Sequence, residues 1–224
     1  MRPKIGITTP NTLFHPAYYF IKFSVWLCGG RPVPLRTQTT IEREGIQGLV
    51  LGGGTDVFPQ LFEGMPKEKY KYDRERDEME IAWLKKAEID KIPVFAICRG
   101  TQMMNVMNIG TLHLDVSLAY ENAHYPKNLL RKIFYRKKIE IEQGSLFHTL
   151  TRSKTLRVNS MHTQSIDKIG NHLNITAQEK NGVVQAIERP NHPFYLGVQF
   201  HPEFMIWRPT MQALFRGLVN AAKT

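Results

Sequence analysis

Cys98 stands at the end of an apolar segment, with a small residue two positions away on each side, Ala96 and Gly100. This spacing is typical of a nucleophile elbow, a sharp strand-to-helix turn that leaves no room for larger neighbours. The start of the following helix favours a thiolate, and the N–H of Arg99 would face a developing oxyanion. The segment therefore predicts a nucleophilic cysteine, with a buried structural cysteine as the alternative. Cys28 has no such surroundings and is interpreted as structural.

A nucleophilic thiol needs a base, and the base needs a group that orients it. His201 follows a strand-like segment that could bring it to the sheet edge where Cys98 emerges. Glu203, two residues further on, could accept the Nδ1 proton of His201 and so set its tautomer. A His-Pro-Glu sequence alone is more often a simple turn. Together with the elbow, it predicts His201 as the base and Glu203 as its partner.

Three consecutive glycines, Gly52 to Gly54, follow another buried apolar segment. Glycines allow the backbone to approach a ligand closely. The phosphate-binding patterns GxxxxGK[ST] and GxGxxG are both absent. We interpret the segment as a loop that donates a second oxyanion N–H, and a plain tight turn is the alternative.

The elements that must position these residues follow from hydrophobic periodicity. We expect helices at 17–28, 75–90, 98–108 and 210–222, and strands at 4–8, 31–35, 48–51, 92–97, 132–141, 156–158, 173–177, 183–188 and 195–199. Nearly continuous apolar strands that alternate with helices predict a parallel sheet covered on both faces, with some antiparallel strands in the second half. The expected fold class is α/β, a three-layer α/β/α sandwich with a mostly parallel central sheet.

The composition is that of an ordinary globular protein, with 224 residues, 42% hydrophobic and 22% charged. We expect a single domain over residues 1–224. Two distant cysteines form no disulfide framework or metal pair, which favours a cytoplasmic protein, and no apolar run suggests a membrane helix or a signal peptide. We expect no metal, because no HExxH or CxxC pattern occurs. We also expect no organic cofactor, because the thiol chemistry requires none.

The net charge of +10 raises the question of an anionic partner. The densest basic stretch is Lys127 to Lys138, and it matches no nucleic-acid motif. We interpret it as a solvated face, with an anion-facing surface as the alternative. Arg76 and Asp77 are also left with two interpretations. They form either an exposed charged pair at a helix N-terminus, where the dipole favours Asp, or part of a site rim.

Six stretches in this order resemble the class I glutamine amidotransferase-like superfamily, and within it the γ-glutamyl-γ-aminobutyrate hydrolase family (peptidase C26). They are Gly52–Pro59; Arg76-Asp77 with Glu80; Ile97–Gln102 followed by Asn105; Gly110–Leu112; Val158–Gln164; and Gly197–Glu203. The resemblance covers nearly the whole chain. It implies the flavodoxin-like fold of that superfamily.

The resemblance also implies a catalytic triad of Cys98, His201 and Glu203, and an oxyanion hole from the N–H groups of Gly53 and Arg99. It implies substrate-binding roles for Gln102, His162 and Gln164, of which His162 is open to a structural interpretation. The chain departs from the family in three places: Ala96 where glycine is usual, Asn108–Gly110 where a Gly-Gly pair is common, and a shortened region at Leu118–Lys132.

The function expected from this resemblance is hydrolysis of a γ-glutamyl amide, such as γ-glutamyl-γ-aminobutyrate, through a glutamyl thioester. The partner is then a small-molecule substrate, with no membrane and no nucleic acid. A second possibility is a glutaminase subunit that delivers ammonia to a separate synthase, because no synthase domain is fused to the chain. A third is a non-catalytic protein of the same fold that binds anions or nucleic acid.

Overall fold

The computed structural model of the chain describes residues 1–11, 15–39, 45–68, 70–123 and 135–224. Nine strands form one sheet in the order β2-β1-β3-β4-β11-β10-β9-β6-β7. Their bounds are β1 Lys4–Thr8, β2 Arg31–Leu35, β3 Gly48–Leu51, β4 Val94–Ile97, β6 Lys137–Ile141, β7 Thr155–Val158, β9 Asn174–Glu179, β10 Val184–Glu188 and β11 Tyr195–Val198.

The first five strands of this order pair in parallel, and the remaining four pair antiparallel. Parallel neighbours need crossover connections, which helices supply here. The helices are α1 Pro16–Leu27, α3 Arg74–Ile89, α4 Arg99–Met107, α5 Val116–Ala119, α7 Leu146–Thr151 and α8 Pro209–Ala221, with 3-10 turns η1 Pro59–Phe62 and η2 Pro202–Met205.

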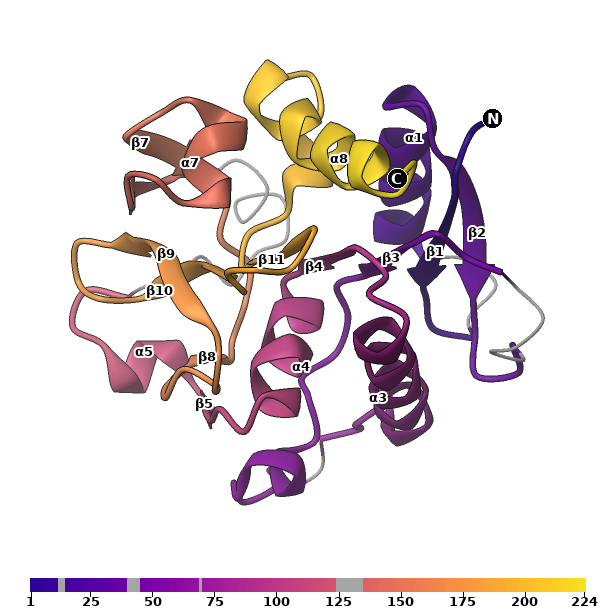
Figure 1. The fold of residues 1–224 in the computed structure, drawn as a ribbon. Helices are drawn as coiled ribbons and strands as arrows, with labels where there is room; N and C mark the ends of the chain where they lie inside the picture. Colours follow the sequence, from indigo (N-terminus) through magenta and orange to yellow (C-terminus); the bar gives the residue numbers. More distant parts are fainter. Residues whose placement is uncertain (12–14, 40–44, 69, 124–134) are drawn as a thin grey trace.

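The helices lie in two layers, one on each face of the sheet (Figure 1). The helices α1, α7 and α8 cover one face, and α3 and α4 cover the other. The side chains of strand β4 pack against the helices on both faces of the sheet. Phe95 and Ile97 belong to the core under α1 and α8, whereas Val94 and Ala96 belong to the core under α3 and α4. This alternation with period two explains why the strand is apolar throughout.

The predicted three-layer α/β/α sandwich is confirmed, and the antiparallel strands fall in the second half as expected. The strands predicted at 4–8, 31–35 and 48–51 have the same bounds in the structure. The prediction missed a small second sheet, β5 (Leu112–His113) with β8 (Ser165–Ile166). Strands of two residues are too short to show a period, so their pairing depends on the fold around them.

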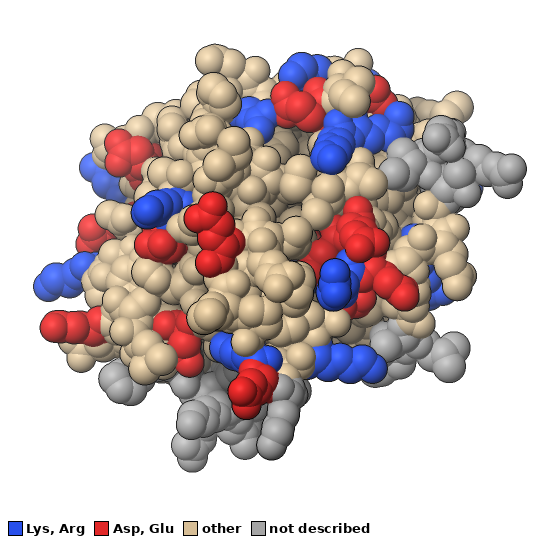
Figure 2. All heavy atoms as spheres, turned by 90° about the horizontal axis from the view of Figure 1, so that it is seen from below, with Lys and Arg blue, Asp and Glu red and all other residues tan. Residues whose placement is uncertain are grey.

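The outer surface on the side of α3 and α4 carries both acidic and basic side chains, which are interspersed (Figure 2). Most of the basic stretch Lys127–Lys138 lies outside the described residues. Within its described part, Lys137 forms an ion pair with Glu179 at 3.2 Å, and Lys138 is exposed. Among the described residues, no helix has the length and apolarity that a membrane crossing requires.

Candidate active site

Cys98 occupies the turn between β4 and α4 in a backbone conformation that non-glycine residues rarely adopt, with φ 51° and ψ −106°. A left-handed residue of this kind costs on the order of 1–3 kcal/mol and persists only where its neighbours hold it. The N–H of Cys98 donates to the carbonyl of Val198 at 2.8 Å, which ties the turn to β11. A Cβ on Gly100 would lie 2.4 Å from the Leu51 carbonyl oxygen, so α4 requires glycine there. The elbow predicted from the spacing of small residues is present.

His201 lies between Cys98 and Glu203. Its Nδ1 is 2.7 Å from Oε1 of Glu203. All three residues are buried. Burial by itself lowers the pKa of His201, but Glu203 and Cys98 outweigh it and raise this pKa to about 10. Such a histidine is held as an imidazolium beside the thiol, the state that an ionised cysteine nucleophile needs.

Gln199 is a neighbour of the thiol that the sequence analysis left without a role. Its side-chain amide lies 3.6 Å from Sγ of Cys98. The residue stands two positions before His201, just beyond the end of β11. Alternation along this extended segment places Gln199 and His201 on the same side, and that period was the available signal.

The glycine loop packs directly against His201. A Cβ on Gly53 would come within 2.8 Å of Cε1 of the imidazole, so only glycine leaves the ring undisturbed. Within the described chain, no hydrogen bond takes up the backbone N–H of Gly53 or of Arg99. Arg99 is the first residue of α4, where N–H groups have no acceptor inside the helix. The two donors predicted for an oxyanion hole are therefore available, and that role stays a prediction.

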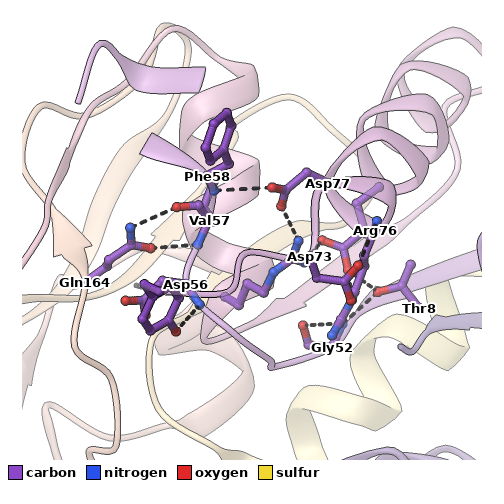
Figure 3. Close-up of polar contacts among 12 residues, drawn as sticks. Thr8, Gly52, Asp56, Val57, Phe58, Asp73, Arg76, Asp77 and Gln164 are labelled. Carbon is purple, nitrogen blue, oxygen red and sulfur yellow. Dashed lines mark hydrogen bonds and ion pairs between the residues drawn. The ribbon is translucent and has the colours of Figure 1, made fainter. Parts of the chain in front are cut away.

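A buried network of four charged side chains lies behind this loop. Arg99 pairs with Glu80 and Asp77 of α3, and Arg76 pairs with Glu80 at 2.9 Å. Arg76 also donates to the Gly52 carbonyl at 3.0 Å, and Thr8 donates its hydroxyl to Glu80 at 2.7 Å (Figure 3). The network joins β1, the glycine loop, α3 and the elbow.

The interpretation of Arg76 and Asp77 as an exposed charged pair is wrong, because their exposed fractions are 1% and 2%. Burial raises the pKa of the Asp77 carboxyl. Burial also works to raise the pKa of Glu80, but the two arginines outweigh it and lower it. A signal existed in the sequence. Arg76 and Glu80 are in helical phase with Trp83, a core residue of α3, and polar residues on such a stripe are buried with it.

We expect Arg99→Met to destabilise the protein by about 3–5 kcal/mol, because two carboxylates would stay buried without their main cation. For a domain of this size that lowers the melting temperature by roughly 6–20 °C. Lys86→Met is the matched control, since it breaks an exposed ion pair of α3, Lys86 to Asp90 at 2.6 Å. Such a pair contributes about 0.2–1 kcal/mol. Thermal unfolding of both variants measures the difference, and equal shifts would contradict a structural role for the network.

The three residues predicted to bind substrate already make bonds within the protein. The amide nitrogen of Gln102 donates to the Gln164 carbonyl at 2.8 Å. The side chain of Gln164 bonds both the N–H and the carbonyl of Val57 (Figure 3). The Nδ1 atom of His162 lies 2.8 Å from the Gln164 carbonyl. These side chains hold the loop after Gly54 in place, and direct contact with a substrate stays a prediction.

A cavity of about 740 Å³ opens beside His201 and Gly53. Its wall includes Met161, which precedes His162 in the chain, and aromatic side chains from α1 and from the segment that follows Glu203. A second cavity of about 690 Å³ shares Gly54 and Thr55 with it. Lys71 and Arg74 line this second cavity. The cavity beside His201 is therefore mostly apolar, and the charged side chains line the neighbouring one.

A family model described as Peptidase C26 matches residues 16–203, which include Cys98, His201 and Glu203. The chain belongs to the peptidase C26 family. This family consists of hydrolases related to glutamine amidotransferases. The resemblance that the six sequence stretches suggested is therefore confirmed.

Named relatives of this family member agree with the assignment. It is 33% identical to a glutamine amidotransferase-like protein of Rickettsia prowazekii over 286 aligned positions, covering 99% of this chain and 98% of the relative. It is 31% identical to the γ-glutamyl-γ-aminobutyrate hydrolase of Escherichia coli O157:H7, covering 80% and 72% of the two chains. The fold matches a glutamine amidotransferase of Thermotoga maritima, with a TM-score of 0.70, 15% identity and full coverage of both chains.

In the described part of this peptidase C26 family member, no three His, Cys, Asp or Glu side chains gather as metal ligands would. The polar chemistry near Cys98 is that of the thiol, an imidazole, a carboxylate, the Gln199 amide and backbone N–H groups. Such a set can attack a carbonyl carbon, stabilise the resulting oxyanion and protonate a leaving group.

Proposed function

We propose that this protein is a cysteine-dependent hydrolase of γ-glutamyl amides, with Cys98, His201 and Glu203 as its catalytic triad. The observation that carries the proposal is the position of His201, whose Nδ1 lies 2.7 Å from Oε1 of Glu203 and whose pKa is raised by both Glu203 and Cys98. A buried histidine in this arrangement can give a proton to a leaving amine while Glu203 keeps its ring oriented.

The proposed reaction has two steps. The Cys98 thiolate attacks the side-chain carbonyl carbon of the glutamyl group, and the N–H groups of Gly53 and Arg99 stabilise the oxyanion. His201 donates a proton to the amine nitrogen, the C–N bond breaks, and a glutamyl thioester remains on Cys98. Water then gives its proton to His201 and its oxygen to the thioester carbon, which releases glutamate and restores the thiolate.

A γ-glutamyl-γ-aminobutyrate-like amide is the first substrate to test, because a relative 31% identical to this chain has that hydrolase name. The alternative from the same chemistry is a glutaminase that passes ammonia to a separate synthase. It uses the same residues and differs only in the leaving group and in its dependence on a partner.

The test is release of free glutamate from γ-glutamyl-γ-aminobutyrate and from glutamine by the purified protein. The proposal predicts steady release from the γ-glutamyl amide by the chain alone. Hydrolysis of glutamine only, and only on addition of a synthase, would favour the amidotransferase alternative. No release from any γ-glutamyl amide would refute the hydrolase.

A further inference from the structure

Aromatic side chains continue from His201 along one wall of the 740 Å³ cavity. Phe204 stacks on the imidazole of His201 with ring centroids 5.5 Å apart and an interplanar angle of 27°. Phe20 of α1 meets Phe204 edge-on at 5.1 Å. Trp207 and Met161 complete this surface. We call these four residues, Phe20, Met161, Phe204 and Trp207, the aromatic wall.

Two members of the aromatic wall are exposed to solvent. Phe20 is 47% exposed and Trp207 is 66% exposed. Large apolar side chains left in water at the mouth of a cavity are typical of a ligand-binding surface, because covering them releases the water that they order. Their place beside the reactive imidazole ties this surface to the chemistry of the site.

The direction of the leaving group follows from the proton that it must receive. In the proposed hydrolysis His201 donates this proton, so the amine nitrogen has to lie within hydrogen-bond distance of the imidazole. The substituent on that nitrogen then extends away from Cys98 along the surface that begins at His201. That surface is the aromatic wall.

The electrostatics of the cavity set which substituents fit. Among the described residues that line it, only His15 and His201 titrate, and there is no Lys or Arg. Burial, together with Arg76 and His201, lowers the pKa of His15 and favours its neutral form. A carboxylate on the leaving amine would lose water there, and among these lining residues it would meet only the imidazolium of His201, whose Nδ1 already pairs with Glu203. An apolar ring would gain contacts with Phe20, Phe204 and Trp207.

We propose that this cavity is the leaving-amine subsite, and that it selects amines with an aromatic or bulky apolar substituent over amines that carry a carboxylate. The inference rests on the proposed γ-glutamyl hydrolase function and specifies its substrate class. Lys71 and Arg74 line the other cavity, where they stand with Asp73 and Glu75.

The experiment compares kcat/KM for γ-glutamylbenzylamide and for γ-glutamyl-γ-aminobutyrate, whose reacting amide groups are of the same kind. Covering one face of a phenyl ring is expected to favour the benzylamide by roughly tenfold or more. A ratio of one or below would overturn the subsite and leave the hydrolase intact. Failure to cleave either compound would instead refute the hydrolase, and the subsite with it.

Two variants of α1 make the test specific. Phe20→Ser should remove most of the preference for the benzylamide, because Phe20 belongs to the aromatic wall. Phe23→Ser is the matched control, since Phe23 is 48% exposed on the same helix and does not line the cavity. It should keep the wild-type ratio. Equal ratios in the two variants would overturn the proposal. The proposal would also be overturned if Phe20→Ser changed the molecular mass measured by light scattering and kept the preference for the benzylamide. Phe20 would then belong to an interface between protein chains.

Discussion

Replacing Cys98 by alanine is expected to lower the rate of glutamate release by a factor on the order of 10⁵–10⁶, as for other enzymes that lose their nucleophile. The loss is this large because no group near the elbow can replace the thiolate. The alanine variant keeps the backbone contacts that hold the elbow, such as the N–H bond to Val198. Its fold is therefore expected to persist, and a circular dichroism spectrum checks this. Activity within tenfold of wild type would remove Cys98 from the mechanism.

Cys28 is the control within the same chain. Its thiol lies 3.5 Å from the Gln212 carbonyl, and burial raises its pKa. Cys28→Ala is therefore expected to keep the wild-type rate. Iodoacetamide gives an independent measurement, because it alkylates thiolates. Peptide mapping after brief treatment at pH 7 should find Cys98 modified and Cys28 unmodified, and the reverse pattern would contradict the assignment.

Glu203→Gln is expected to lower kcat by about 10⁴, the scale seen when a triad loses its orienting carboxylate. Glutamine has nearly the shape of glutamate, so the variant tests charge and not packing. With an amide beside Nδ1, His201 loses the partner that fixes its tautomer and stabilises its imidazolium. The measurement is kcat with γ-glutamyl-γ-aminobutyrate. A loss below about tenfold would show that Glu203 does not orient the base.

The same variant predicts a shift in pH dependence. In the wild type His201 has a pKa of about 10, so kcat/KM should fall only as the pH approaches that value, where the imidazolium loses the proton that the leaving amine needs. Removing the charge of Glu203 lowers the pKa of His201 and moves the alkaline limb to lower pH. If the alkaline limb of the pH profile lay at the same pH in both proteins, it would report the titration of a group other than His201.

The stability of the fold should also depend on pH through His201, and the direction of this dependence follows from its pKa. The pKa of His201 rises from 6.5 in the unfolded chain to about 10 in the fold, so folding takes up a proton between these values. Its contribution is complete below pH 6.5 and is lost as the pH rises through 10. The difference in melting temperature between the wild type and Glu203→Gln should therefore shrink over this window.

Much of the site could be predicted from the sequence because its parts are local. The elbow needs small residues two positions on either side of Cys98, and the structure shows why at Gly100, where the Leu51 carbonyl lies too close for a side chain. Glu203 is two residues from His201, so their contact depends on one short turn. The buried parallel strands could also be predicted. Helices cover both faces of β3 and β4, so the residues of these strands are apolar throughout.

The burial of charge could not be predicted in the same way. The phase of Arg76 and Glu80 with Trp83 indicates a buried stripe, but it does not show which partner allows these charges to be buried. That partner is Arg99, which approaches from the elbow. Charges enter a protein interior only when partners from other elements meet them there. The partners here are 19 and 22 residues apart in the chain. No local pattern encodes that meeting.

The sequence by itself determined the order of the longer strands and helices in the chain, the nucleophile elbow and the His-Pro-Glu turn, because these depend on period and on close neighbours. It did not show the short elements β5, β8, α5 and α7. Only the tertiary structure decided that Gln199 lies beside the thiol, that Gln164 holds Val57, and that Phe20 packs edge-on against Phe204 in one wall of the cavity. These contacts join segments up to 184 positions apart and form only when the layers pack. The substrate preference that we propose depends on them.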